Sequence, residues 1–388
     1  MEIILIILIL IVIHGYGGYT LPIIVSRLIH SRKTKGEIGE VKKHSISIVI
    51  AAYNEETCIA EKIINTLSID YPKTLLDIII VTDGSNDRTF EIASSYDSVR
   101  CFHENSRKGK MAAIDRIMPY VHSEITVFTD ANTLLNKDCL IAINKHFLLQ
   151  NVGGVAGEKK VEVLKTTDNK RKPQEGIYWK YESFLKQIDS AYYSVVGAAG
   201  ELYAIRTSLY EYPGEQVILD DFLISMNICK KGFVFKYEPG AYALEQPSIN
   251  LKEERKRKIR IAAGGIQAIL LLQSLLNIIR YKKLSYLYIS HRVLRWTIIP
   301  FALILIFGVS MVLYFQNNSI WISSCFFLQC IFYGLGLLGF VIRGHKYIYK
   351  ITAIPNYFIF MNYSQILGLI RYLRGKQTSV WEKANRLD

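Results

Sequence analysis

Charged and polar residues follow several short apolar runs of this 388-residue chain. Asp83 ends the run "LDIIIVTD", and Asp130 ends the run "ITVFTD", with the amide Asn132 two positions later. Lys108 and Lys110 follow a third run, "VRCF". Carboxylates accept hydrogen bonds from a base or a ribose, lysines neutralise phosphate, and a divalent cation can bridge pyrophosphate oxygens to a protein oxygen. Together these residue types suit a nucleoside diphosphate.

Each of these residues also has a simpler explanation. Asp83 precedes Gly84, and both are common turn residues. Asp130 could cap a turn, and the two lysines could lie on a solvated face. A binding site is favoured over these separate explanations only if the residues lie close together in the fold. The strands and helices that carry them must therefore be identified.

Strand and helix patterns alternate between residues 45 and 245. Strands are expected at 46–51, 76–81, 99–102, 125–129 and 233–237, and apolar residues recur at helical spacing in 55–70 and 87–96. This alternation predicts an α/β fold with a mostly parallel sheet covered on both faces. Ligands of such sheets bind beyond the carboxyl ends of the strands. The acids and lysines therefore collect at one edge of one sheet.

Five segments in order carry a resemblance to a known family. They are "SIVIAAYNEE", "VTDGSNDRT", "FTDANT", "GAAGELYAIR" and "LDDF". They resemble the family 2 glycosyltransferases, which have the nucleotide-sugar-binding GT-A fold. The apolar stretches add similarity to the membrane-bound branch that includes hyaluronan, chitin-oligosaccharide and poly-N-acetylglucosamine synthases. The motifs cover residues 45–262, and the tail "GKQTSVWEKANR" is of a kind found in such enzymes.

The resemblance implies a donor site for a UDP-sugar. Asp83 corresponds to the acid that contacts the uridine, and Ala52, Tyr53 and Glu55 lie in the loop that borders the base. Lys110 would contact the diphosphate or the base.

The segment "DAN" occupies the position of the family's DxD motif. Asp130 would then face the ribose and the diphosphate. Asn132 takes the place of the second acid, which usually meets the metal. An amide oxygen can ligate Mg²⁺ or Mn²⁺ but brings no charge, so the expected metal site is a weak one that relies on diphosphate and water.

The acceptor side is implied by the two later motifs. Gly200 and Glu201 would border the acceptor, together with Asp220. Asp221 matches the family's general base, which takes the proton from the acceptor hydroxyl as that oxygen attacks the anomeric carbon. One base suffices for inversion at an activated donor, whereas a glycosidase needs two carboxylates. An Asp at this place could instead only cap the helix that follows.

Polymerising members of the family carry a Gln-x-x-Arg-Trp motif near the membrane. The matching stretch here is "RKIRI", with Arg257 at the Gln position, Arg260 at the Arg position and Ile261 at the Trp position. Arg257 and Arg260 would contact the donor diphosphate. Ile261 offers no flat face for a sugar ring, so we expect short products. The same stretch could instead be a basic helix face on anionic lipid.

Three long stretches carry no charge and are long enough to cross a bilayer as helices. They run over 3–24, 296–315 and 320–342. The first lacks the basic start of a signal peptide, because Glu2 precedes it, so a retained anchor is favoured over a cleaved signal. Basic residues follow the first and third stretches, which predicts an external amino terminus and cytoplasmic residues 28–293 and 343–388.

These patterns give the expected organisation. It comprises a membrane helix (1–27), a GT-A domain (44–245), basic and interfacial helices (246–293), two membrane helices (294–342) and an interfacial helix with a basic tail (343–388). The net charge of +13 could indicate nucleic-acid binding. The basic residues lie beside the apolar stretches, which favours anionic membrane lipids as their partner instead. We expect no nucleic-acid partner and no obligate protein partner. The six cysteines show no metal-ligand spacing.

The expected function is inverting transfer of N-acetylglucosamine or another hexose from a UDP-sugar. The acceptor would be an envelope glycan or a lipid-linked glycan, at the cytoplasmic side of the cell membrane. Two alternatives remain open. One is transfer to a polyprenyl phosphate, whose acceptor oxygen is already an anion and needs no base. The other is a non-catalytic subunit for glycan export, although the acids Asp83, Asp130 and Asp221 argue against a relic site.

Overall fold

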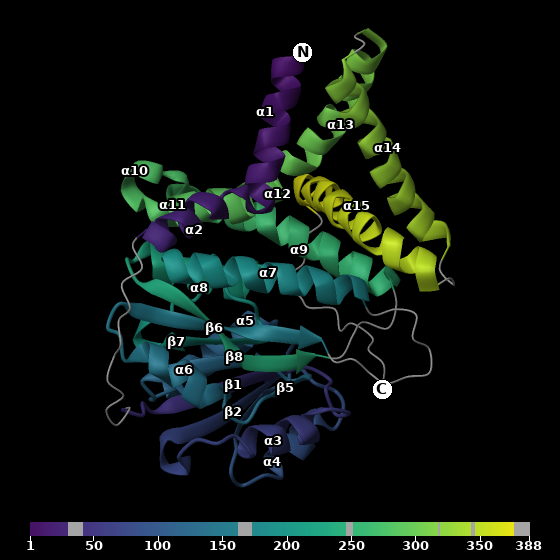
Figure 1. Ribbon diagram of the computed structural model, residues 1–388. Helices are drawn as coiled ribbons and strands as arrows, with labels where there is room; N and C mark the ends of the chain where they lie inside the picture. The colour runs from purple at the N-terminus through teal and green to yellow at the C-terminus, as the bar shows by residue number, and fades with distance from the viewer. Residues whose placement is uncertain (30–41, 162–172, 246–250, 317–318, 343–345, 376–388) are drawn as a thin grey trace.

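The computed structural model describes residues 1–29, 42–161, 173–245, 251–316, 319–342 and 346–375. Its elements form stacked layers (Figure 1). An eight-stranded sheet with its helices lies at one end, a layer of long helices lies across it, and three helices project from that layer at the other end. The predicted tail "GKQTSVWEKANR" lies outside the described residues, apart from its first glycine.

The sheet joins a parallel half to a mixed half. Its strands are β1 Ile46–Ala52, β2 Leu76–Asp83, β3 Arg100–Glu104, β4 Ile125–Asp130, β5 Thr133–Leu135, β6 Val152–Val161, β7 Leu202–Arg206 and β8 Val234–Glu245, in the order β3-β2-β1-β4-β7-β6-β8-β5. Strands β3, β2, β1 and β4 run parallel. β7 is antiparallel to β4 and β6, and β5 is antiparallel to β8, while β6 and β8 are parallel. The predicted α/β class and the five predicted strands are confirmed.

Strand β6 has no counterpart among the predicted strands, because its sequence "VGGVAGEKKV" is rich in glycine. The structure shows why glycine is needed there. A Cβ at Gly154 would lie 2.1 Å from the ring of Phe235, and one at Gly157 would lie 2.7 Å from Leu202. The neighbouring strands pack too closely for side chains, so packing rather than strand propensity selects these residues.

Alternation along β1 builds two cores. Ile46, Ile48 and Ile50 belong to the core on the face covered by α3 (Ile59–Leu67) and α6 (Cys139–Phe147). Val49 belongs to the opposite core, which includes residues of α5 (Lys110–Ile117) and α8 (Asp220–Lys230). The period of two thus puts one apolar row on each face of the sheet.

A layer of long helices covers the second core (Figure 1). It consists of α2 (Thr20–Ile29), α7 (Pro173–Tyr192), α9 (Leu251–Leu271) and α15 (Lys346–Leu373). α15 is continuous through Pro355, and two of its amides bond to other helical segments: Asn356 donates to the carbonyl of Gly336, and Asn362 bonds to Tyr16. These two asparagines therefore serve helix packing.

Two helices are long and apolar enough to cross a membrane, α13 (Ile298–Gln316) and α14 (Ile320–Val341). The first uncharged stretch differs from the expected straight span. α1 (Glu2–Ile13) passes through the π-helical turn His14–Gly18 into α2, and the two parts meet at a bend of 53°. Gly17 allows the bend with φ +124. α1 projects with α13 and α14, whereas α2 lies in the helix layer (Figure 1).

Shorter helices complete the chain. They are α4 Thr89–Ser94, α10 Ile278–Tyr281, α11 Lys283–Tyr288 and α12 Leu294–Trp296, and a π-helical turn, Ile289–Val293, joins the last two.

Candidate active site

A cavity of about 280 Å³ lies between the strand ends and the helix layer. Eight of the residues predicted from the sequence line it: Lys110, Asp130, Gly200, Glu201, Asp220, Asp221, Arg257 and Arg260. They come from α5, β4, the turn before β7, the first turn of α8, and α9. The predicted residues Ala52, Tyr53, Glu55, Asp83 and Asn132 are not among its lining.

Gly200 lies at the point where three charged groups converge. A Cβ at this residue would be 3.4 Å from Asp221 Oδ2, 3.6 Å from Lys110 Nζ and 4.0 Å from Asp130 Oδ2. Lys110 Nζ also bonds to Asp130 Oδ1 at 2.7 Å. Burial alone would lower the pKa of Lys110, but Asp130 and Asp220 together raise it, so the ammonium stays charged. Glycine keeps open a space that cation, carboxylate and base all border.

Asp221 has the protonation behaviour of a base that works near neutrality. Burial and the adjacent carboxylate of Asp220 raise the pKa of Asp221 to about 7, against the opposing influence of Lys110 and of the hydrogen bond from the Phe222 N–H, 2.7 Å long. A general base is most effective when its pKa is near the working pH.

Glu201 is held in a different state. Its Oε1 accepts from Lys159 Nζ at 2.5 Å, and Lys159 also pairs with Glu245. Burial alone would raise the pKa of Glu201, but Lys159 holds it at about 2. Glu201 is therefore a fixed, paired carboxylate, which makes it a poorer proton acceptor than Asp221.

The two candidate metal ligands lie at the end of β4 and just beyond it. Asn132 Oδ1 is buried and has no hydrogen-bond partner among the described residues, a state that is costly unless a ligand satisfies it. The described residues contain no group of three or more His, Cys, Asp or Glu side chains that could hold a metal. Asp130 and Asn132 thus fit a divalent cation whose other ligands come from diphosphate and water.

Asp83 binds the backbone of the loop that follows β3. Its carboxylate accepts from the backbone N–H of Lys108 at 3.1 Å and of Gly109 at 2.6 Å. The same loop places the Arg107 guanidinium 3.7 Å from the centre of the Tyr53 ring. Arg107 was not among the predicted residues. It joins the predicted base-bordering loop to the lysines of the cavity.

The two arginines of α9 differ in their contacts. Arg257 bonds to Glu254 at 3.1 Å. Arg260 makes no hydrogen bond or ion pair with any described residue, and burial lowers its pKa against the opposing influence of Asp220. Arg260 is therefore the more available of the two for an anion in the cavity.

Aromatic residues that the sequence motifs did not single out also line the cavity. Tyr178 and Trp179 come from α7, and Trp296 ends α12. Trp296 packs against Phe222, with ring centres 5.2 Å apart. Trp296, at the start of the second apolar stretch, thus brings a flat ring to the cavity although Ile261 offers none, and the expectation of short products stays a prediction. No motif marks α7, and only its dense aromatic spacing could have drawn attention to it.

Comparisons with known proteins agree with this geometry. Residues 47–212 match the sequence model of Glycosyl transferase family 2. They therefore form a family 2 glycosyltransferase domain, and the fold around them is GT-A.

Two curated relatives and one solved structure describe the similarity. The chain is 25% identical over 247 residues to a poly-beta-1,6-N-acetyl-D-glucosamine synthase of Staphylococcus epidermidis, covering 62% of this chain and 58% of the relative. It is 30% identical over 122 residues to a beta-monoglucosyldiacylglycerol synthase of Trichormus variabilis, covering 30% of this chain and 26% of the relative. The chain thus spans about a quarter to somewhat over half of these relatives.

The solved structure is a mannosyltransferase from Pyrobaculum calidifontis in complex with GDP-mannose and Mn²⁺. It is 20% identical, with a TM-score of 0.71, and the match covers 97% of this chain and 99% of that one. The fold, including the helix layer and the projecting helices, is therefore one that a known enzyme also has.

Proposed function

We propose that the protein is an inverting glycosyltransferase that moves a hexose from a UDP-sugar to the hydroxyl of an envelope glycan or a lipid-linked acceptor. The observation that carries the proposal is the convergence of Asp221, Lys110 and Asp130 around Gly200 in one cavity. A nucleotide-sugar reaction needs a base, a diphosphate contact and space between them, and these three groups border such a space.

The residues have distinct roles in this proposal. Asp221 accepts the proton of the acceptor hydroxyl, whose oxygen forms a bond to the anomeric carbon while the bond from that carbon to the diphosphate breaks. Lys110 and Arg260 stabilise the charge on the leaving UDP. Asp130 and Asn132 would hold Mg²⁺ or Mn²⁺, which supplies further neutralisation of the diphosphate when bound.

The donor assignment draws support from the relatives' names. One relative is a poly-beta-1,6-N-acetyl-D-glucosamine synthase and another is a beta-monoglucosyldiacylglycerol synthase. N-acetylglucosamine and glucose are therefore the first hexoses to test. Purified protein in detergent is offered a panel of UDP-sugars, and mass spectrometry identifies the product. One UDP-sugar should give UDP and a glycosylated product, and the absence of UDP release with every donor would contradict the proposal.

Direct transfer to a polyprenyl phosphate is the second candidate. An anionic phosphate oxygen needs no base, so under that mechanism Asp221 would contribute little. The pKa of about 7 at Asp221 favours a hydroxyl acceptor, because it suits a group that takes up a proton during the reaction.

Short products remain part of the proposal. Ile261 stands where a stacking Trp would hold a growing chain, and two helices, or three with the bent pair, meet the length and apolarity of a span among the described residues. Product size with excess donor tests this. Long polymer appearing early, without short intermediates, would assign the stacking role to Trp296 or Trp179.

A further inference from the structure

A second cavity, of about 340 Å³, adjoins the candidate active site. It lies among the π-helical turn with Tyr16, α7, α12 and α15. Both cavities are lined by Tyr178, Arg292, Trp296, Met361 and Gln365, so they share a wall. These shared residues lie between the predicted acceptor residues, which line the first cavity, and the second cavity among the helices.

Away from the shared residues the lining of the second cavity is mainly apolar, although Arg295, Asn362 and three tyrosines also border it. Aromatic side chains of α7 and α15 and aliphatic side chains of α15 make most of its lining. Its amide Asn362 is already bonded to Tyr16, with 2.9 Å from Nδ2 to the hydroxyl. The aliphatic and aromatic side chains of this lining can accommodate a hydrocarbon chain.

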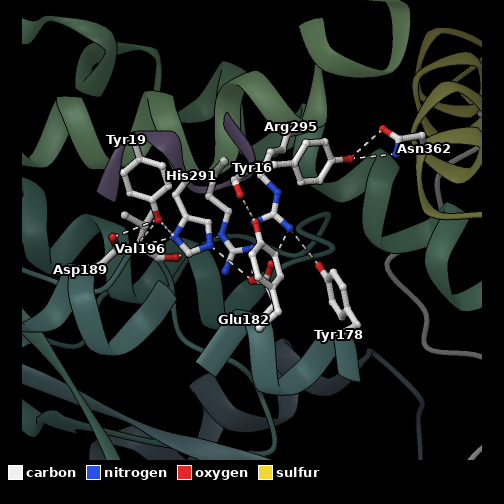
Figure 2. A network of polar contacts seen from close by, with 11 residues as sticks. Tyr16, Tyr19, Tyr178, Glu182, Asp189, Val196, His291, Arg295 and Asn362 are labelled. Atoms are coloured by element: carbon white, nitrogen blue, oxygen red, sulfur yellow. Dashed lines mark hydrogen bonds and ion pairs between the residues drawn. The ribbon is translucent and has the colours of Figure 1, made fainter. Parts of the chain in front are cut away.

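Positive charge is concentrated where the two cavities meet. Figure 2 shows Glu182 of α7 facing Arg295 and His291. The Glu182 carboxylate lies 2.5 Å from Arg295, 3.3 Å from His291 and 3.4 Å from Arg292. The other ring nitrogen of His291, Nδ1, lies 2.5 Å from Asp189 Oδ2. One carboxylate therefore serves two guanidinium groups. Arg295 Nη1 is buried and has no hydrogen-bond partner among the described residues.

Lys186 is a buried lysine without a visible counter-ion, and burial together with Arg292 lowers its pKa, so an anion in the cavity would favour its charged form. It follows Glu182 by one turn of α7, lines the active-site cavity and is 4% exposed. It makes no hydrogen bond or ion pair with any described residue, and its closest described contacts are the rings of Tyr237 at 5.6 Å and Trp179 at 6.0 Å. The nearby carboxylates are engaged: Glu158 accepts from Ser183, and Glu201 pairs with Lys159. A buried, unpaired ammonium is unfavourable unless an anion joins it.

We propose that the acceptor is an amphipathic lipid phosphate, with its phosphate held by Lys186, Arg292 and Arg295 and its hydrocarbon chain in the second cavity. This inference rests on the proposed function, and it specifies the acceptor of that same site. Because the two cavities adjoin, a sugar linked to the phosphate of such a lipid would extend into the active-site cavity, which Asp221 lines. The hydrocarbon chain enters from the bilayer, because the second cavity lies in the layer from which the candidate spans project.

Binding to the wild-type protein provides the first test and needs no donor. Farnesyl phosphate, farnesol and inorganic phosphate are titrated separately, and quenching of tryptophan fluorescence is recorded, since Trp296 lines both cavities. We expect farnesyl phosphate to bind about tenfold or more tightly than either of the others, because a phosphate that meets charged donors gains strong hydrogen bonds. Equal binding of farnesol would overturn the phosphate site, and equal binding of inorganic phosphate would overturn the lipid chain.

Transfer kinetics provide the second test. The acceptors are farnesyl diphosphate-linked N-acetylglucosamine and farnesyl N-acetylglucosaminide, which share sugar and chain but differ in charge. Lys186→Gln should raise the KM of the charged acceptor about tenfold or more relative to wild type, and it should change the KM of the neutral one far less. Lys180→Gln is the matched control, because Lys180 is an exposed lysine of the same helix. Equal KM changes for both acceptors would contradict the proposal.

Failure of the proposed function would look different. A wild-type protein that binds farnesyl phosphate but no UDP-sugar would contradict the glycosyltransferase assignment and leave the lipid phosphate site standing. A protein that uses UDP-sugar but gives equal KM for both acceptors would keep the assignment and overturn the lipid phosphate site. If Lys186→Gln does not fold, the farnesyl phosphate titration on the wild-type protein still tests the lipid phosphate site.

Discussion

Three side chains around Gly200 carry the proposed chemistry, and each is controlled by its neighbours. Asp221 is a weak acid because it is buried beside Asp220, whereas Lys110 stays charged because Asp130 faces it. These opposite effects arise within about 4 Å of one backbone position. The site therefore separates a proton acceptor from a permanent cation by local electrostatics alone.

Asp221→Asn removes the proposed base but keeps the size of the side chain. We expect the rate of sugar transfer to fall about 10²–10⁴-fold, the usual contribution of a positioned base. The affinity for UDP, measured by calorimetry, should change little, because the proposed role of Asp221 is toward the acceptor hydroxyl. Asp138→Asn, which changes an exposed Asp at the start of α6, serves as the control. Full turnover in Asp221→Asn would move the base elsewhere or favour a phosphate acceptor oxygen.

The raised pKa of Asp221 sets the pH dependence. The base must be deprotonated, so kcat/KM should rise with pH and level off above about 7, where the carboxylate is ionised. The neighbouring charge of Asp220 helps to raise this pKa, so Asp220→Asn should lower it and shift the acidic limb of the profile to lower pH. An unchanged limb in Asp220→Asn would show that another group controls it.

At the scale of elements, much of the parallel half of the sheet follows from the sequence. Strands β1, β2 and β4 combine β-branched residues with polar tips, and their predicted starts agree with the structure. β6 could not be predicted in this way, because its glycines are required by close packing against Phe235 and Leu202 of other strands. The same holds for the aromatic residues of α7 and α12 that line the active-site cavity, Tyr178, Trp179 and Trp296, because only packing between distant segments brings them together.

The helices α9 and α15 both line the cavity, and the contact between them depends on Gly368. A Cβ there would lie 2.4 Å from the Ala262 Cβ and 2.8 Å from the Ala263 nitrogen, so the helices would have to separate. Overpacking of this kind costs about 1–3 kcal/mol, more than the gain of up to about 1 kcal/mol in helix propensity. Gly368→Ala should therefore lower the unfolding temperature in detergent.

Gly308→Ala on α13 is the matched control for this change. A Cβ at Gly308 meets no atom within 4 Å, so this helix glycine should tolerate alanine without loss of stability. Equal unfolding temperatures for the two variants would mean that the α9–α15 contact is not tight.

At the scale of the whole molecule, the sequence predicts which stretches are apolar but not how they bend. α1 alone has 12 residues and would be about 18 Å long, short of a ~30 Å hydrocarbon core. The bend at Gly17 could not be inferred from hydropathy, because it depends on contacts of Tyr16 and Tyr19 with α15 and α7. The second cavity likewise requires four segments that lie far apart in the chain.

The predicted topology has three crossings, with the amino terminus outside and the catalytic domain and carboxyl end inside. A reporter fused after Asp388 should be active only on the cytoplasmic side, and an epitope before Met1 should be accessible from outside the cell. An epitope accessible only after permeabilisation would show that α1 does not cross, which would leave the hairpin of α13 and α14 as the membrane anchor.

The stereochemistry of the product tests the central claim most directly. A single base opposite a diphosphate leaving group allows one displacement, which inverts the anomeric centre. The product formed from an α-linked UDP-sugar by the purified wild-type protein is analysed by NMR for the coupling at the anomeric proton. The account predicts a β-linked product whose formation is lost in Asp221→Asn. An α-linked product, or a β-linked product formed by Asp221→Asn at the wild-type rate, would contradict it.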